Sequence, residues 1–196
     1  MPIVTEPLLT PADVADSARL CRQALEPGLD RDWSVPAGDL EWDCRRTLDH
    51  IADALLFYAA LLATRATARI AAPRNGDPTA SPAQLLTTVE AAAAILADVI
   101  RAAPPETRAF HPAGMADASG WIGMACEEIL LHTDDIAQGL GLRFRPPDEL
   151  SRRINARIFP WAPTDADPWA ALRWAAGRAA LPDRERLGPD WWWHCA

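Results

Sequence analysis

The chain has 196 residues, enough for one domain with an appendage and for a sizeable buried core. Hydrophobic residues make up 49% of it, which excludes an intrinsically disordered chain. The formal net charge of −8, with no basic stripe along the sequence, excludes a nucleic-acid partner held through its phosphates. All 19 basic residues are arginine, a composition typical of a GC-rich genome.

The sequence gives no sign of membrane association or export. Its apolar runs are shorter than the ~20 residues that a membrane-spanning helix needs. The N-terminal segment lacks the basic start and the uninterrupted apolar core of a signal peptide. We therefore expect a cytoplasmic location, and the four cysteines, which form no Cys-x-x-Cys pair, are expected to be reduced and packed as small hydrophobic residues.

Four long helices are predicted before residue 142, over the ranges 10–25, 44–70, 81–103 and 119–141. The first opens with Thr10 and a proline at the first helical position, and the third opens with Ser81 and a Gln84 that completes a capping box. No segment alternates with period two for long enough to predict a strand. The pattern predicts an all-α protein whose residues 1–142 form a four-helix bundle.

Residues 143–196 differ in sequence pattern from the four long helical segments and are predicted to form a C-terminal extension. Short helices are expected within 146–163 and over 168–177, followed by an irregular tail. Three successive tryptophans in that tail cannot share one face, so some of them must cover a neighbouring surface. The extension is too short for an independent core, and we expect it to pack on the bundle.

The fourth helix carries ionisable residues beside its apolar face. At roughly 100° per residue, an apolar arc is formed by Ile122, Ala125, Ile129, Ile136 and Leu140. Glu128, His132 and Asp135 border this arc and are expected to be wholly or partly buried. The opposite, solvated side is predicted to hold Glu127, Asp134 and Gln138. A buried carboxylate requires compensation, either from a Glu–His hydrogen bond within the core or from a bound ion.

A second helix offers a further ligand. On the predicted helix 44–70, His50 shares a core stripe with Ala54, Phe57 and Leu61. Two imidazoles from His50 and His132 and the carboxylate of Glu128 form a donor set used by catalytic zinc. The same set suits nickel, iron or manganese, so the residues alone predict a divalent metal without fixing its identity.

These motifs resemble those of a known family. Trp42 and His50, in the pattern W-x7-H, precede E-x3-H-x2-D-x-A-x2-L-G from Glu128 to Gly141. The pair is similar to the motifs of the DinB-like metalloprotein superfamily, and most closely to the N-terminal domain of mycothiol-dependent maleylpyruvate isomerase. The resemblance covers residues ~10 to ~142.

The resemblance implies a DinB-like bundle that holds a divalent metal, usually zinc, through His50, Glu128 and His132. Asp135 matches the family's trailing aspartate and is interpreted as an outer partner of the site or as a helix-packing group. Family members use small thiols, so mycothiol is an expected cosubstrate. The extension of this chain is shorter than the C-terminal domain of the isomerase, which leaves the substrate unassigned.

The remaining candidate residues are given structural interpretations. His111 is expected in a surface loop and His194 in a flexible tail, while Trp42 is expected to pack at a helix entry. The wheel turns Cys126 away from the metal stripe, and Cys44 is likewise displaced. No internal thiol is therefore aimed at the site, and thiol chemistry would require one from outside.

Three functions follow from these features. The leading hypothesis is a metal-dependent enzyme that uses a small thiol for S-transfer or isomerisation of a small electrophile. The second is a hydrolase that uses a metal-activated water at the same site. The third is a non-catalytic metal- or ligand-binding bundle. The expected partners are a small-molecule substrate and a thiol, with a homodimer left open.

Overall fold

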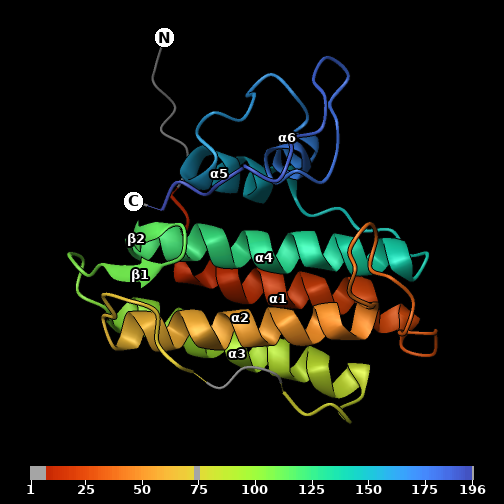
Figure 1. Ribbon diagram of the computed structural model, residues 1–196, viewed down its shortest axis with the longest axis horizontal. Coiled ribbons are helices and arrows are strands. Elements are labelled where there is room, and N and C mark those ends of the chain that lie inside the picture. The colour runs from red at the N-terminus through yellow and green to blue at the C-terminus, as the bar shows by residue number, and fades with distance from the viewer. Residues whose placement is uncertain (1–7, 73–75, 196) are drawn as a thin grey trace.

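A computed structural model describes residues 8–72 and 76–195 of the chain, and Figure 1 shows that helices dominate it. The elements in chain order are α1 (Pro11–Leu25), the 3-10 turn η1 (Glu26–Gly28), α2 (Cys44–Ala63), α3 (Pro82–Ala102), β1 (Ala109–His111), β2 (Gly114–Ala116), α4 (Ala118–Gly139), α5 (Asp148–Ile158) and α6 (Pro168–Ala175). The predicted all-α class is confirmed.

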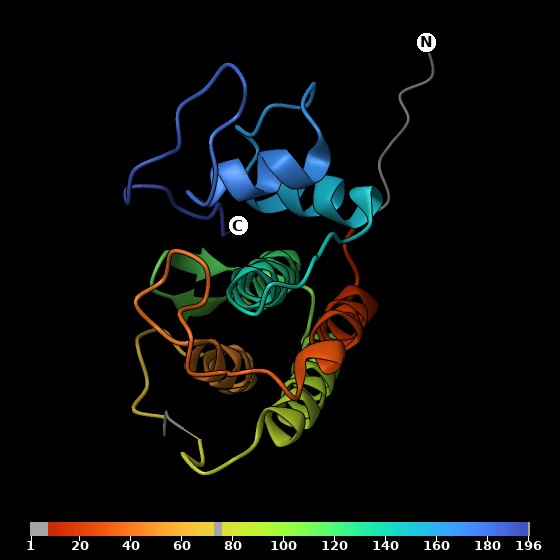
Figure 2. The same cartoon turned by 90° about the vertical axis from the view of Figure 1, so that its right-hand side faces the viewer.

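The four long helices form a bundle, which Figure 2 shows nearly end-on. α1 packs against α3 and α4, and α2 packs against the same two helices. The order around the bundle is therefore α1, α3, α2, α4, with α1 and α2 on one diagonal. This arrangement places α2 beside α4, the two helices that carry the predicted metal ligands.

The helices begin where their capping residues predict. Thr10 and Ser81 each form a capping box, with Asp13 and Gln84 at the third helical position. α2 and α4 begin after aspartates whose side chains accept from backbone amides of the first turn. These side chains satisfy amides that have no partner within the helix, which fixes each start locally.

α2 ends at Ala63 rather than near residue 70 as predicted. Arg65 adopts a positive φ of 48°, and the amides of Arg65 and Ala66 donate to carbonyls of the last helical turn. Such a left-handed closing turn usually carries glycine, and an arginine at this position does not indicate one. The carbonyl of Ala66 then accepts from the amide of Phe110 at 2.7 Å, which joins the end of α2 to β1.

A small β-hairpin was not predicted. β1 and β2 pair antiparallel over three residues each, too short a stretch for an alternating pattern to be read. The hairpin lies between α3 and α4 in the chain and beside α2. Its consequence is to carry His111 inside the molecule, where that side chain is only 4% exposed.

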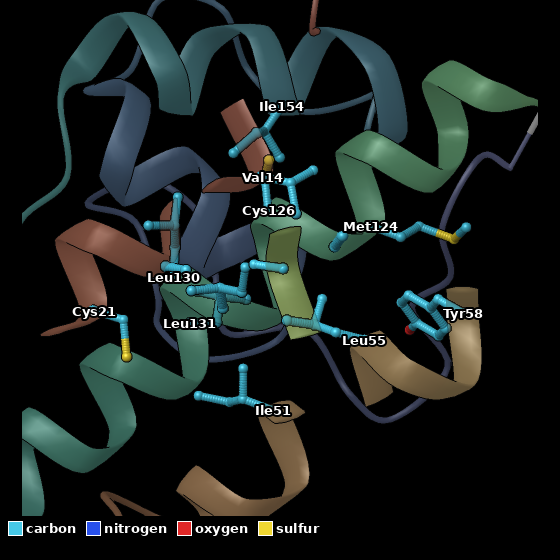
Figure 3. Close-up of a cluster of buried hydrophobic side chains, with 14 of the residues drawn as sticks. Val14, Cys21, Ile51, Leu55, Tyr58, Met124, Cys126, Leu130, Leu131 and Ile154 are labelled. Atoms are coloured by element: carbon cyan, nitrogen blue, oxygen red, sulfur yellow. The ribbon is translucent and has the colours of Figure 1, made fainter. Parts of the chain in front are cut away.

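The C-terminal extension covers α4. Figures 1 and 2 show α5 and α6 as a layer on the side of α4 away from α3. Apolar side chains from α1, α2, α4 and α5 meet in one continuous core, part of which is drawn in Figure 3 with Val14, Ile51, Leu130 and Ile154.

This layer overturns one prediction about α4. Gln138 is exposed as expected, but Glu127 and Asp134 are buried, at 3% and 7% exposure. The physical reason is that the extension lies on the face predicted to be solvated. Arg173 of α6 forms an ion pair with Asp134, its Nε lying 3.0 Å from Oδ2.

One helix, α3, is long and apolar enough to satisfy the length and composition criteria for a membrane span. It packs against both α1 and α2 within the bundle. The core helix of a bundle meets the same criteria, so they carry little weight here.

Candidate metal centre

The three predicted ligands meet between α2 and α4. Glu128 and His132 are four residues apart on α4 and therefore project from one face of that helix. His50 reaches them from α2. One donor atom from each of the three side chains lies within 4.8 Å of the other two.

The spacing of the donor atoms suits a small cation. Glu128 Oε2 lies 3.2 Å from His132 Nε2 and 3.6 Å from His50 Nε2. Ligands at ~2.0–2.1 Å from a tetrahedral zinc ion are separated by roughly 3.3–3.4 Å, so these distances require little adjustment. The donor set and its spacing therefore fit a divalent metal.

The second ring nitrogen of His132, Nδ1, contacts a carboxylate on the side away from the other ligands. Its Nδ1 lies 3.1 Å from Asp135 Oδ2, and Arg178 Nε approaches both carboxylate oxygens of Asp135 at 3.2 Å. A carboxylate on Nδ1 keeps the proton there and leaves the Nε2 lone pair for coordination, the usual arrangement behind a metal-binding histidine.

The charges in the site stabilise one another. Burial alone would raise the pKa of Glu128, but hydrogen bonds from His132 and His50 hold it well below its usual value. Burial would likewise lower the pKa of His132, whereas its bonds to Asp135 and Glu128 raise it to about 9. In the metal-free protein a proton therefore binds where a metal would, and the two compete.

Two cavities adjoin the ligands, and both are lined by His50, Glu128 and Trp193. One of about 190 Å³ also touches Arg178, and the other, of about 200 Å³, touches Tyr58. Trp193 and Arg178 belong to the extension. The site is therefore built by the bundle and roofed by the C-terminal residues.

Glu127 lines the smaller cavity beside Glu128. Burial, followed by the charge of Glu128, raises the pKa of Glu127 to about 8. The Glu127 carboxyl therefore holds its proton more tightly than an exposed glutamate does.

Sequence reasoning missed Tyr58 and misplaced His111. Tyr58 Oη donates to Glu128 Oε1 at 2.9 Å, and His111 Nε2 lies 3.3 Å from Tyr58 Oη. Tyr58 follows His50 and Ala54 at intervals of four, a signal that was present in the sequence. The prediction that His111 is a surface residue is wrong, because the hairpin carries it inward.

The other aromatic candidates lie near the site or on its cover. Trp42 is 40% exposed, and its ring packs edge-on against His50, with a centroid separation of 5.0 Å. The His194 side chain is exposed, but its backbone is bound to α5, with its amide donating to the Ile158 carbonyl at 2.8 Å.

The cysteines stand apart from the three ligands. All four are free and buried, and none joins the His50, Glu128 and His132 group within the described residues. Burial raises the pKa of Cys126 to about 12 and that of Cys44 to about 11. These thiols are protonated at neutral pH and serve as packing groups.

A helical bundle with a His, Glu, His cluster between two of its helices defines a DinB-like protein. Residues 13–137, more than half of the chain, match the mycothiol maleylpyruvate isomerase N-terminal domain family. The chain belongs to that family. No curated protein and no solved structure matches the chain.

Proposed function

We propose that this protein is a divalent-metal-dependent enzyme that uses a small thiol of the mycothiol type for S-transfer or isomerisation of a small electrophile. The observation that carries the proposal is the convergence of His50, Glu128 and His132 beside two cavities, in a chain of this family. Zinc is the proposed metal because the resemblance to the family implies it and the donor set suits it.

His50 and His132 would hold the metal through Nε2, and Glu128 would hold it through Oε2. A bound zinc ion supplies a Lewis acid that favours the thiolate form of a thiol at neutral pH. Asp135 keeps the proton of His132 on Nδ1, and Arg178 orients Asp135. Trp193 lines both cavities beside the ligands on the side of the extension.

The thiol is proposed to come from outside the chain. The four internal thiols are buried and away from the donor group, and burial is the largest influence raising the pKa of each. Reduced, buried cysteines also agree with the cytoplasmic location that the proposal includes. The expected partners are therefore a small thiol and a small electrophile.

The test begins with the metal content of the purified protein. His132→Ala should abolish stoichiometric zinc, while His194→Ala, which removes an exposed imidazole in the tail, should leave it unchanged. Full zinc content in His132→Ala would overturn the ligand assignment.

Turnover of electrophilic substrates is then compared with mycothiol, with glutathione and without thiol. We expect turnover only when a thiol is present. Equal rates without thiol would favour the hydrolase, and no turnover together with tight binding of an unrelated ligand would favour a binding protein.

A further inference from the structure

A chain of buried hydrogen bonds runs from the hairpin to the candidate metal centre. His111 on β1 contacts Tyr58 on α2, with Nε2 and Oη 3.3 Å apart. Tyr58 Oη in turn lies 2.9 Å from Oε1 of Glu128 on α4. Both His111 and Tyr58 are 4% exposed, so the chain lies inside the protein.

The direction of these hydrogen bonds is fixed by a backbone amide. The N–H of Ala113 donates to His111 Nδ1 at 3.1 Å, so Nδ1 is an acceptor and the ring proton lies on Nε2. Nε2–H then donates to Tyr58 Oη, which leaves the tyrosine proton to Glu128 Oε1. Burial lowers the pKa of His111 to about 4, which agrees with a neutral ring.

Aromatic packing holds both donors in place. The ring of Trp121 contacts Tyr58 and His111 at centroid separations of 5.0 and 5.5 Å. The ring of Trp193 contacts His111 at 5.1 Å. Figure 3 shows the Tyr58 ring at the margin of the buried hydrophobic cluster. Aromatic packing of this kind holds the side chains of a site in fixed rotamers.

The two oxygens of Glu128 consequently have different partners. Oε1 accepts from Tyr58, whereas Oε2 faces His132 Nε2 and His50 Nε2 at 3.2 and 3.6 Å. A carboxylate with one oxygen already bonded offers the other in a defined direction. Removing the Tyr58 hydroxyl would leave Oε1 buried without that hydrogen bond. The carboxylate would then lose a contact that fixes its orientation, and a buried acceptor that loses its donor costs free energy.

We infer that Tyr58, oriented by His111, is a positioning residue that fixes Glu128 so that Oε2 alone is presented to the metal. The inference rests on the proposed function, because it requires a metal at His50, Glu128 and His132. Hydrogen-bonded groups behind a metal ligand commonly change metal affinity by about 10- to 100-fold.

The test measures the zinc dissociation constant by competition with a chromogenic chelator. Tyr58→Phe keeps the ring and removes only the hydroxyl, and we expect it to weaken zinc binding on the order of tenfold or more. His111→Phe should weaken binding less, because the Tyr58 hydroxyl remains. Adding His111→Phe to Tyr58→Phe should cause no further loss, since His111 acts through Tyr58.

Thr47→Val is the matched control. Thr47 is fully buried on the same helix, and its hydroxyl donates to the Asp43 carbonyl at 2.8 Å and not to a metal ligand. It should lower the unfolding temperature without changing the zinc dissociation constant. An equal loss of affinity in this control would show that the effect in Tyr58→Phe is one of general stability, which overturns the inference.

The outcomes separate the inference from the function. Zinc binding by the wild type that is unchanged in Tyr58→Phe overturns the positioning role alone. A further loss in the double variant overturns the serial order from His111 to Tyr58. Failure of the wild type to bind zinc, cobalt or nickel overturns both the inference and the proposed function.

Discussion

Glu128 keeps its negative charge although its side chain is buried. Three donors surround its carboxylate, the imidazoles of His50 and His132 on Oε2 and the hydroxyl of Tyr58 on Oε1. The contacts of His132 and Tyr58, at 3.2 and 2.9 Å, are short enough for hydrogen bonds, and His50 at 3.6 Å adds a nearby imidazole, so together they offset part of the cost of removing the carboxylate from water. The site is therefore organised before any ligand enters.

The first prediction concerns the carboxylate behind His132. Asp135→Asn keeps the shape of the side chain but removes the charge that faces Nδ1, so His132 becomes a poorer electron donor. We expect zinc affinity to fall by about tenfold. The measurement is a chelator competition.

Asp134→Asn provides the control for Asp135→Asn. Asp134 is also buried and also bound to an arginine of the extension, but its partner is Arg173 and it does not contact His132. It should leave zinc affinity unchanged. If both variants lose affinity equally, the effect comes from docking of the extension and not from the His132 contact.

A second prediction follows from the neutral, buried imidazole of His111. Burial lowers its pKa from 6.5 to about 4, so between these values the unfolded chain takes up a proton that the folded protein does not. The contribution of His111 to the free energy of unfolding is therefore complete above pH 6.5 and decreases as the pH falls towards 4. The full difference corresponds to about 3 kcal/mol.

Chemical unfolding of metal-free protein between pH 7.5 and 4.5 measures this effect. The wild type should lose more stability over that interval than His111→Phe, in which the titrating group is absent. Comparing the two proteins cancels the contribution that carboxylates titrating in the same range make to the change in stability. Parallel curves for the two proteins would contradict the expected contribution.

At the scale of elements, glycines on α4 allow the extension to approach closely. A Cβ at Gly120 would lie 2.0 Å from the backbone carbonyl oxygen of Cys195, and one at Gly123 would lie 2.6 Å from Ile158 Cγ2. The Cys195 carbonyl also accepts from Arg157 on α5. The absence of side chains at these positions is therefore what lets the tail lie on α4.

The third prediction is that Gly120→Ala destabilises the protein although alanine favours helices. The gain in helix propensity is about 1 kcal/mol, but displacement of the 195 carbonyl and its hydrogen bonds should outweigh it, with a net loss of about 1–2 kcal/mol. Gly188→Ala is the control, because nothing lies within 4 Å of its added Cβ. A higher unfolding temperature for Gly120→Ala would show that the tail moves away without cost.

The elements were predictable where local chemistry determines them. Thr10 and Ser81 mark helix starts because a cap depends on residues within one turn. The end of α2 was not predictable, because Arg65 takes a left-handed conformation that arginine does not signal. Glu127 and Asp134 were misplaced because a helical wheel records the positions of residues on one helix and not what packs against them.

The candidate site also has a part that the sequence could predict and a part that it could not. The convergence of His50, Glu128 and His132 follows from helical spacing on two helices that face each other, and their ligation of a metal remains a prediction. Arg178 and Trp193 reach the site from the extension, and no periodic pattern reveals where an extension docks. The sequence therefore indicated the ligands but not their cover.

At the scale of the whole molecule, the extension and the bundle share one core. A bidentate polar connection joins α1 and α5, where both terminal nitrogens of Arg153 donate to Asp13 at 2.8 Å. Burial would raise the pKa of Asp13, but hydrogen bonds from Arg153 and Thr10 outweigh it and lower that pKa. This ion pair is thus present at neutral pH and is lost in acid.

The last prediction is that bundle and extension unfold as one cooperative unit. Six of the nine tryptophans lie after residue 142, so tryptophan fluorescence reports mainly on the extension, while far-ultraviolet circular dichroism reports mainly on the four long helices. The two transitions should coincide.

Asp13→Asn should lower stability by about 2 kcal/mol and shift both transitions together, because it breaks a buried charge pair between the two parts. Asp16→Asn, on the same helix but exposed, should change stability by less than about 0.5 kcal/mol. A fluorescence transition that moves alone in Asp13→Asn would show that the extension detaches while the bundle stays folded.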